Sequence, residues 1–198
     1  RICDAACGTG LLIAHLVDDD QPRSVVGYDR SEEMLAVARD RLPGVELEGG
    51  DLRETIPFSG VFDLITCVYD SLNYLRTEED VAAFFDAATT ACASEGVLLF
   101  DANGIDLYKK RHGGFISRLI DGVPFRQSLE YDPGPPPAAT TTFSFDDGTE
   151  VHVQRPWEPE EIEAQIERVG FRIVESLDVM DEDVGVPSGK IVYIAVAR

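Results

Sequence analysis

Asp4-Ala5-Ala6-Cys7-Gly8-Thr9-Gly10 joins a short apolar run to a segment with helical spacing, near the start of this 198-residue chain. Glycines at positions 8 and 10 let the backbone pass close to a ligand, and the next helix begins with unpaired N–H donors. A dinucleotide-binding loop would carry a third glycine where this chain has Ile13. The stretch therefore predicts a ligand at the carboxyl end of a buried strand, and it argues against a pyrophosphate.

The chain around this stretch alternates between apolar runs and helix-period segments up to about residue 101. That alternation is the pattern of repeated βαβ units around a parallel sheet. We expect strands at residues 2–4, 25–29, 45–48, 62–68, 97–101, 171–178 and 191–196, and a late helix that starts near Pro159 and stops at Gly170. Ser31 and Thr77 are predicted to cap two further helices. The second of these helices carries an apolar stripe at helical spacing, which consists of Val81, Phe84, Phe85 and Ala88.

The pattern changes between about residues 105 and 155, where aromatic and β-branched runs are separated by turn signals. These signals are Asp121-Gly122, the proline-rich residues 132–137, and Asp146-Asp147-Gly148. We expect residues 105–155 to form a β-rich insertion that covers the substrate site, and residues 1–104 and 156–198 to form the core. A linker to an independent domain is the alternative, but the flanking strands are too few for a separate core.

Acidic residues stand at the ends of three predicted strands. Asp4 ends the first, Asp29 ends the second, and Asp51 follows the third. Asp29 comes 19 residues after Gly10, where a carboxylate can accept hydrogen bonds from both hydroxyls of a ribose held over the loop. Because parallel strands present their carboxyl ends at one edge of a sheet, we expect the three carboxylates to face one crevice.

These residues resemble the class I S-adenosylmethionine-dependent methyltransferases. Residues 4–10 look like the first motif of that family, residues 29–35 like its acidic second motif, and Gly50-Asp51-Leu52 like its third. Residues 62–66 and 69–75 are similar to the fourth-strand region of members that act on small molecules, including amino-sugar N-methyltransferases. The resemblance covers residues 1–104 and 157–198, including the Gly170-Phe171 end of the late helix.

The resemblance implies an α/β fold, a Rossmann-like, doubly wound sheet of seven strands whose last strand is antiparallel, and S-adenosylmethionine as cofactor. It also implies a helix before the first strand, so we expect a segment to precede residue 1. Asp4, Gly8 and Gly10 would line the methionine end, Asp29 would hold the ribose, Asp51 and Leu52 would meet the adenine, and Tyr69 would lie near the sulfonium. The expected cofactor set also contains Ala5, Cys7, Arg30, Met34 and Val68.

Methyl transfer from a sulfonium is an in-line displacement of an activated leaving group, so alignment of the reactants supplies much of the acceleration. We expect no metal and no covalent nucleophile. An amine acceptor has only to arrive neutral, whereas a hydroxyl acceptor benefits from a general base. His152 alternates with two valines on a predicted strand and is our candidate base, with Tyr69 and Tyr74 as further catalytic candidates.

Other polar residues are expected near the substrate. Asp70 and Asn73 follow strand four, where Asp70 could attract a cationic amine. Asp101 and Asn103 close strand five at the same rim. We assign none of them a specific role.

The composition limits the partners. Lys and Arg total 17 against 37 Asp and Glu, and the net charge of −20 repels nucleic acids and anionic lipid surfaces. No apolar stretch is long enough to span a membrane. Four cysteines without a Cys-x-x-Cys pair predict reduced, buried thiols and a cytoplasmic protein.

Our first hypothesis is a methyltransferase that acts on an N or O atom of a small-molecule acceptor, as a monomer or a homodimer. A nucleic-acid or protein methyltransferase is the alternative among methyltransferases. A nucleic-acid substrate is opposed by the net charge of −20. In addition, residues 68–71 lack the Asn/Asp-Pro-Pro-aromatic loop that would bind a flipped base. An NAD-dependent oxidoreductase is disfavoured by Ile13, and a cofactor-binding protein without catalysis stays open.

Overall fold

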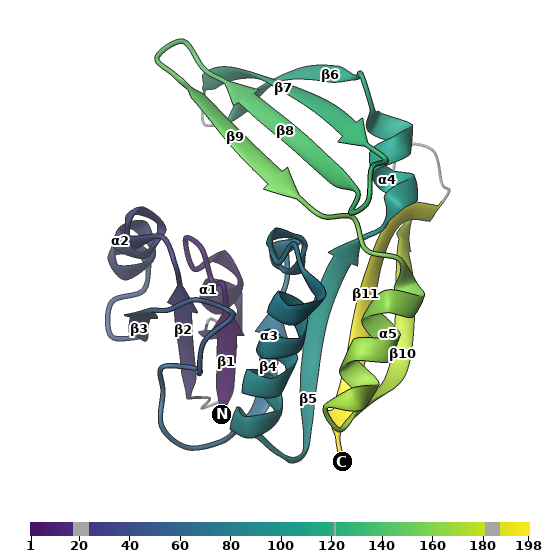
Figure 1. The fold of residues 1–198 in the computed structure, drawn as a ribbon. Helices are drawn as coiled ribbons and strands as arrows, with labels where there is room; N and C mark the ends of the chain where they lie inside the picture. Colours follow the sequence, from purple (N-terminus) through teal and green to yellow (C-terminus); the bar gives the residue numbers. More distant parts are fainter. Residues whose placement is uncertain (18–23, 121, 181–186) are drawn as a thin grey trace.

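The computed structural model describes residues 1–17, 24–120, 122–180 and 187–198. The chain forms two sheets, one of seven strands and one of four. In Figure 1 the smaller sheet lies above the carboxyl ends of the parallel strands of the larger one. The chain enters the upper part after β5 and returns to the core after β9. These two crossings join the layers on one side of the molecule.

The larger sheet has the strand order β10-β11-β5-β4-β1-β2-β3. Its strands are β1 (Ile2–Ala5), β2 (Val25–Asp29), β3 (Glu46–Gly49), β4 (Phe62–Cys67), β5 (Cys92–Asn103), β10 (Phe171–Met180) and β11 (Pro187–Ala197). Neighbouring strands from β3 to β5 pair in parallel, and β11 is antiparallel to both β5 and β10. The expected fold class, a seven-stranded α/β sheet with its last strand antiparallel, is therefore confirmed.

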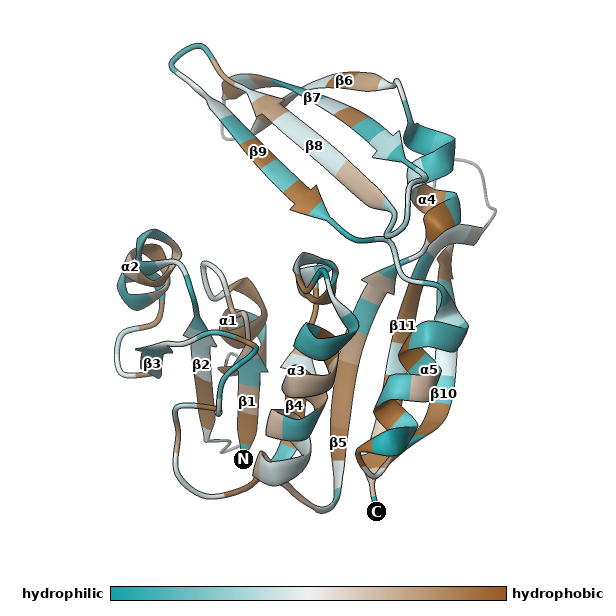
Figure 2. Ribbon diagram, viewed as in Figure 1, coloured by the Kyte–Doolittle hydropathy of each residue, from teal (hydrophilic) through white to brown (hydrophobic). Residues whose placement is uncertain are grey.

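Helices cover both faces of this sheet, because adjacent residues of each strand point to opposite faces. Ile2 and Val25 pack in one buried cluster, and Cys3 and Val26 pack in another. The helices are α1 (Leu11–Val17), α2 (Glu32–Arg41), α3 (Glu78–Ala91) and α5 (Pro159–Arg168), with a 3-10 turn, η1 (Ser71–Tyr74), between β4 and α3. Figure 1 shows α3 and α5 next to each other in front of the sheet, and in Figure 2 the strands they cover are mostly hydrophobic.

Two of these helices begin where the sequence predicts. The Ser31 hydroxyl accepts a hydrogen bond from the Met34 backbone N–H (3.2 Å), and Thr77 does the same for Asp80 (3.1 Å). Each cap satisfies a donor that the first helical turn leaves unpaired. The predicted apolar stripe of α3 is fully buried, and it consists of Val81, Phe84, Phe85 and Ala88.

The smaller sheet is antiparallel throughout, in the order β6-β7-β8-β9. Its strands are β6 (Phe115–Ile120), β7 (Val123–Asp132), β8 (Ala138–Ser144) and β9 (Thr149–Gln154). The proline-rich residues 133–137 connect β7 to β8, and residues 145–148 connect β8 to β9, so both are turns as expected. Asp121, in the remaining predicted turn, lies outside the described residues.

The β-rich segment at residues 105–155 also contains a helix that the sequence did not predict. Residues 105–111 form a helix, α4 (Ile105–Arg111). Its buried residues, Leu107 and Tyr108, pack against Leu129 and Ala139 of the smaller sheet. Three apolar positions within seven residues, Ile105, Leu107 and Tyr108, are too few to establish a helical period, so tertiary packing decided this element.

Strand β5 also differs from its prediction, because it begins five residues before Val97. Glu95 has a positive φ of 60°, and the pairing with β4 shifts register in this region. Such a bulge interrupts the alternation of side chains, which hid the start of the strand in the sequence.

All four cysteines are free and buried, as the sequence predicts. Every helix among residues 1–17, 24–120, 122–180 and 187–198 is too short or too polar to cross a bilayer.

Candidate active site

A cleft of about 1170 Å³ opens between the carboxyl ends of the parallel strands and the edge of the smaller sheet. Its floor and walls come from residues 6–9 after β1, residues 28–31 at the end of β2, and residues 50–53 after β3. Its roof comes from residues 136–138 and 151–153 of the smaller sheet. One cleft therefore unites all three predicted strand-end acids with the insertion.

The glycine loop after β1 is held by Asp29. Its Oδ2 accepts a hydrogen bond from the Gly8 backbone N–H (2.8 Å), and its Oδ1 accepts one from the Ser31 backbone N–H (2.9 Å). Gly8 lies at a positive φ of 55°, and a Cβ added there would meet no atom within 4 Å. The loop thus presents bare backbone to the cleft. A residue with a side chain could adopt this positive φ only with strain.

Asp4 is a buried carboxylate on the cleft wall, with 2% of its surface exposed. Its Oδ1 accepts a hydrogen bond from the Thr66 hydroxyl (2.6 Å). Burial raises the pKa of Asp4 to about 7, against the Thr66 hydrogen bond, which lowers it, and with a smaller upward contribution from the charge of Asp29. A carboxylate that is costly to ionise in this position suits a cationic ligand group, because the cation would stabilise its charged form.

Asp51 is already paired. The Arg53 guanidinium donates to both of its oxygens, at 2.8 Å to Oδ1 and 2.7 Å to Oδ2, and Arg30 lies 4.0 Å from Oδ2. The hydrogen bonds from Arg53 lower the pKa of Asp51 to about 2. Sequence reasoning missed Arg53, although its position two residues after the acid was the available signal. An adenine amino group at Asp51 would share this carboxylate with Arg53.

Two predicted cofactor residues do not line the cleft. Ala5 is fully buried inside β1. Gly10 packs under the end of α2, where a Cβ would come within 2.5 Å of Leu42 Cδ1. Its φ of 75° is also unfavourable for other residues, so the second glycine serves packing rather than the cleft wall. The remaining predicted cofactor residues, which include Cys7, Arg30, Met34, Leu52 and Val68, all line the cleft.

The three catalytic candidates all line the cleft. Tyr69 is 69% exposed on the wall, directly after β4. The Tyr74 hydroxyl lies 2.5 Å from His152 Nδ1, and His152 Nε2 lies 3.6 Å from Glu150 Oε2. Burial, followed by the charge of Asp70, raises the pKa of Tyr74 to about 12. Tyr74 is thus a neutral phenol that bridges the rim of the core to strand β9.

Asp70, which the sequence suggested could attract a cationic amine, is engaged by other residues of the protein. Asp70 does not line the cleft, because its Oδ2 accepts from Gln154 Nε2 (2.7 Å) and its Oδ1 lies 3.2 Å from Lys190 Nζ. Asp101 and Asn103 are buried beneath the same rim and are absent from the wall.

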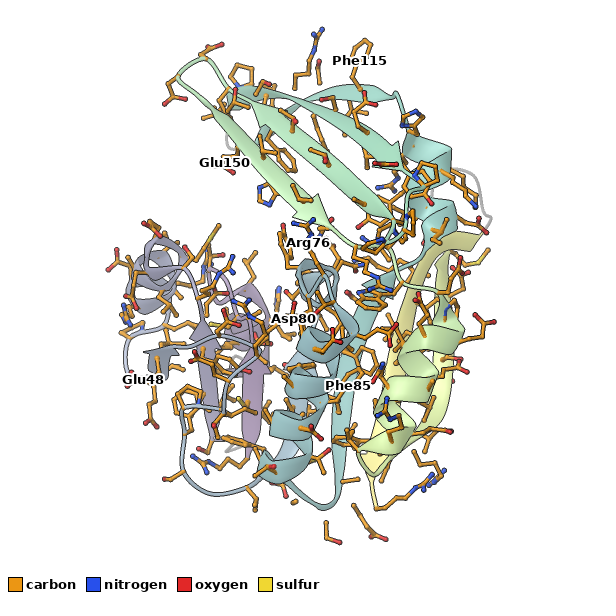
Figure 3. The ribbon with its side chains drawn as sticks, in the orientation of Figure 1. Glu48, Arg76, Asp80, Phe85, Phe115 and Glu150 are labelled. Atoms are coloured by element: carbon orange, nitrogen blue, oxygen red, sulfur yellow. The ribbon has the colours of Figure 1, made fainter. Side chains whose placement is uncertain are left out.

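The structure adds wall residues that the sequence gave no reason to choose. Pro136 and Pro137 form part of the roof, and Arg76 and Asp80 lie at the start of α3. Figure 3 shows Arg76 and Asp80 beneath β9, the strand that carries Glu150. Within the described residues, no three His, Cys, Asp or Glu side chains gather into a group that could hold a metal ion.

Parts of this sequence are similar to known proteins. Residues 2–96 match a family model described as a methyltransferase domain. The putative methyltransferase YqeM of Bacillus subtilis is 40% identical over 107 residues, which are 52% of this chain and 42% of that protein. A dTDP-3-amino-3,4,6-trideoxy-alpha-D-glucopyranose N,N-dimethyltransferase of Streptomyces venezuelae is 27% identical over 98% of this chain and 82% of its own length. The chain thus spans less than half of YqeM and most of the sugar enzyme.

A solved structure has the same fold. The S-adenosylmethionine-dependent methyltransferase of Clostridium acetobutylicum superposes with a TM-score of 0.83 at 24% identity, covering 99% of this chain and 83% of that one. The chain therefore shares its fold with an S-adenosylmethionine-dependent methyltransferase, and its sequence is similar to a methyltransferase domain over residues 2–96 and to an amino-sugar N,N-dimethyltransferase over most of its length.

Proposed function

We propose that this protein transfers a methyl group from S-adenosylmethionine to an N or O atom of a small-molecule acceptor. The observation that carries the proposal is the continuity of the cleft. One cleft is lined by the glycine loop and Asp4 as well as by Tyr69, Tyr74 and His152. A donor site and an acceptor face in one cleft meet the demand of an in-line displacement, which needs both reactants held in alignment.

The residues of the cleft fit the chemistry of the cofactor. Asp4 would pair with the α-amino group, and Gly8 would let the methionine end lie close to the backbone. Each oxygen of Asp29 accepts one backbone hydrogen bond and keeps a lone pair for a ribose hydroxyl. Asp51 and Leu52 would meet the adenine, beside Arg53. When bound, the cofactor supplies a methyl group on a sulfonium that is already activated as a leaving group.

Tyr74 and His152 would act on the acceptor. The Glu150 carboxylate near Nε2 favours a proton on that nitrogen, which leaves Nδ1 to accept from the neutral Tyr74 hydroxyl. A hydroxyl acceptor could pass its proton to Tyr74 as Tyr74 passes its own to His152. A neutral amine would need no base, and the pair would then only orient it.

A small acceptor suits both the roof and the charge. The roof consists of Pro136, Pro137 and the valines that flank His152, so it presents apolar surface close to the rim tyrosines. The net charge of −20 disfavours nucleic acid. The relative from Streptomyces venezuelae is named for an amino sugar.

We assign residues 105–155 to a lid over the acceptor, and residues 1–104 and 156–198 to the cofactor-binding core. We assign the reaction to the cytoplasm, where the four buried thiols would stay reduced.

The first test is calorimetric titration of the protein with S-adenosylmethionine, S-adenosylhomocysteine and NAD. We expect the first two to bind and NAD to give no heat. Binding of NAD alone would overturn the proposal in favour of an oxidoreductase, and binding of none would overturn the donor site.

The second test offers labelled S-adenosylmethionine with four acceptor pools, and counts label in each product. The pools are nucleotide-linked amino sugars, small phenols and alcohols, transfer RNA, and peptides. We expect label in a small molecule. Label only in RNA or peptide would establish one of the alternative acceptor classes, and cofactor binding without label in any pool would favour a protein that binds the cofactor without catalysis.

A further inference from the structure

The segment directly after β4 has an unusual backbone. Tyr69 has a φ of 59° and Asp70 a φ of 53°, so two consecutive residues that are not glycine adopt the left-handed conformation. A bulky residue rarely does so, and such a pair persists only where its surroundings fix it. Strained positions of this kind cluster at functional sites, and Tyr69 lies on the wall of the cleft.

The group that fixes this backbone is the carboxylate of Asp101, at the end of β5. Its Oδ2 accepts a hydrogen bond from the Tyr69 backbone N–H (3.0 Å), and its Oδ1 accepts one from the Asp70 backbone N–H (2.5 Å). Successive N–H groups that point the same way form a small anion-binding concavity, which Asp101 fills from within the protein. Lys190 Nζ lies 3.4 Å from Oδ2 and offsets the buried charge.

The neighbouring side chains leave only Tyr69 free. Asp70 is bound by Gln154 from the end of β9 and by Lys190 from β11. Asp101 is 6% exposed and does not reach the cleft, whereas Tyr69 is 69% exposed on its wall. Residues 69–70 are thus contacted from three elements, and within the described part of the chain the Tyr69 side chain has no hydrogen-bond partner and lies on the wall of the cleft.

We propose that Asp101 is a positioning residue, which holds Tyr69 on the wall of the cleft by binding the backbone N–H groups of Tyr69 and Asp70. This inference rests on the proposed function, because Tyr69 matters to binding only if the cleft holds the cofactor. Asp101 touches no ligand in this scheme and acts entirely through Tyr69.

A double-mutant cycle on cofactor-product binding tests the inference. Affinity for S-adenosylhomocysteine is measured by calorimetry for the parent protein, Asp101→Asn, Tyr69→Ala and the double variant. The asparagine amide leaves one of the two backbone N–H groups without an acceptor. We expect Asp101→Asn and Tyr69→Ala each to weaken binding about tenfold, and the double variant to bind no more weakly than Tyr69→Ala alone. Unchanged affinity in Asp101→Asn, or losses that multiply, would overturn the proposal.

Asp106→Asn is the matched control, because Asp106 is exposed on α4 and the substitution is chemically the same. Its affinity should equal that of the parent. Should Asp101→Asn not fold, Lys190→Gln replaces it in the cycle. Lys190→Gln removes the positive charge beside Asp101. We expect it to weaken binding of S-adenosylhomocysteine less than Asp101→Asn does, and to have no effect in the Tyr69→Ala background.

Fluorine NMR without any ligand gives an independent readout. The six tyrosines are labelled as 3-fluorotyrosine, and the Tyr69 signal is assigned by its absence in Tyr69→Phe. In Asp101→Asn we expect this signal to broaden or split while that of Tyr193, which is buried in the core, stays unchanged. A parent protein that binds no S-adenosylhomocysteine would refute the proposed function, whereas a Tyr69 signal unaffected by Asp101→Asn would refute the positioning role.

Discussion

Both ends of the cleft are held by a strand-end carboxylate that binds two backbone N–H groups. At the glycine loop Asp29 binds those of Gly8 and Ser31, and at the rim Asp101 binds those of Tyr69 and Asp70. The two differ in exposure, because Asp29 lies on the cleft wall and Asp101 lies beneath it. Asp29 and Asp101 therefore each support the loop beside them, and of the two only Asp29 also reaches the cleft, where we propose that it binds the ribose.

The largest expected effect, and the one that best separates Asp29 from Asp101, is that of Asp29→Ala. It removes both loop hydrogen bonds and the proposed contacts to ribose, and hydrogen bonds to a charged group contribute about 1.5–3 kcal/mol each. We expect affinity for S-adenosylhomocysteine to fall at least about 100-fold, compared with about tenfold for Asp101→Asn. Calorimetry measures both, and Asp40→Ala on the exposed side of α2 is the control. Equal losses at Asp29 and Asp101 would erase the distinction between the two carboxylates.

Asn73→Ala tests how far the rim depends on residues distant in sequence. The fully buried Asn73 side chain donates to the carbonyls of Asn103 (2.9 Å) and Arg155 (2.7 Å) and accepts from the Asn103 N–H (2.8 Å). It thereby joins both crossings between core and lid. We expect a loss of roughly 3 kcal/mol in the free energy of unfolding by urea, because buried partners are left unpaired. Ser71→Ala in the same turn, which loses one hydrogen bond to Val68, should cost about 1 kcal/mol.

The pH dependence of S-adenosylhomocysteine binding tests the pairing proposed for Asp4. Asp4 has a pKa raised to about 7 by burial, so only above that pH is it fully ionised and able to pair with an ammonium group. Affinity for S-adenosylhomocysteine should rise about tenfold between about pH 6 and about pH 8. A flat profile in the parent protein would exclude the pairing.

The same pKa predicts the stability of the ligand-free protein. Folding favours the protonated form of Asp4, whose unfolded pKa is about 4, so its contribution to stability falls as the pH rises from about 4 to about 7 and then stays constant. Asp4→Asn should remove this dependence, bind with a flat pH profile, and be more stable than the parent at about pH 8 when no ligand is present.

Tyr74→Phe carries the smallest expected effect. The phenyl ring keeps the contact with His152 but loses the hydrogen bond to its Nδ1. With an amine acceptor, kcat should fall less than about threefold, because no base is needed. A fall of about 100-fold or more would instead indicate a hydroxyl acceptor that uses Tyr74 and His152 to remove its proton. His152→Gln should then show a comparable loss.

Much of the cofactor end could be predicted because its signals are local. Asp4, Asp29 and Asp51 each stand at the end of a strand that alternation and flanking turns reveal, and the βαβ pattern places those ends together. The pairing of Asp51 with Arg53 and the packing of Gly10 against Leu42 escaped prediction, since both depend on side-chain positions in three dimensions.

The rim could not be predicted in the same way. Asp70 was expected to face the substrate, but Lys190, 120 residues further along the chain, and Gln154 turn it into a structural group. Helix α4 likewise exists because Leu107 and Tyr108 find apolar partners on the smaller sheet, not because its seven residues show a helical period.

By itself the sequence determined the sheet, its strand-end acids, the glycine loop and the capped helices, since each follows from residue types a few positions apart. Only the tertiary structure decided which carboxylates are free. That outcome depends on partners such as Arg53 and Lys190, which the fold brings to within hydrogen-bonding reach. The sequence shows only that a residue is an aspartate, and not whether its carboxylate is exposed to water or enclosed by partners. Burial and hydrogen bonding in the folded protein decide whether that carboxylate can bind a ligand or supports a loop.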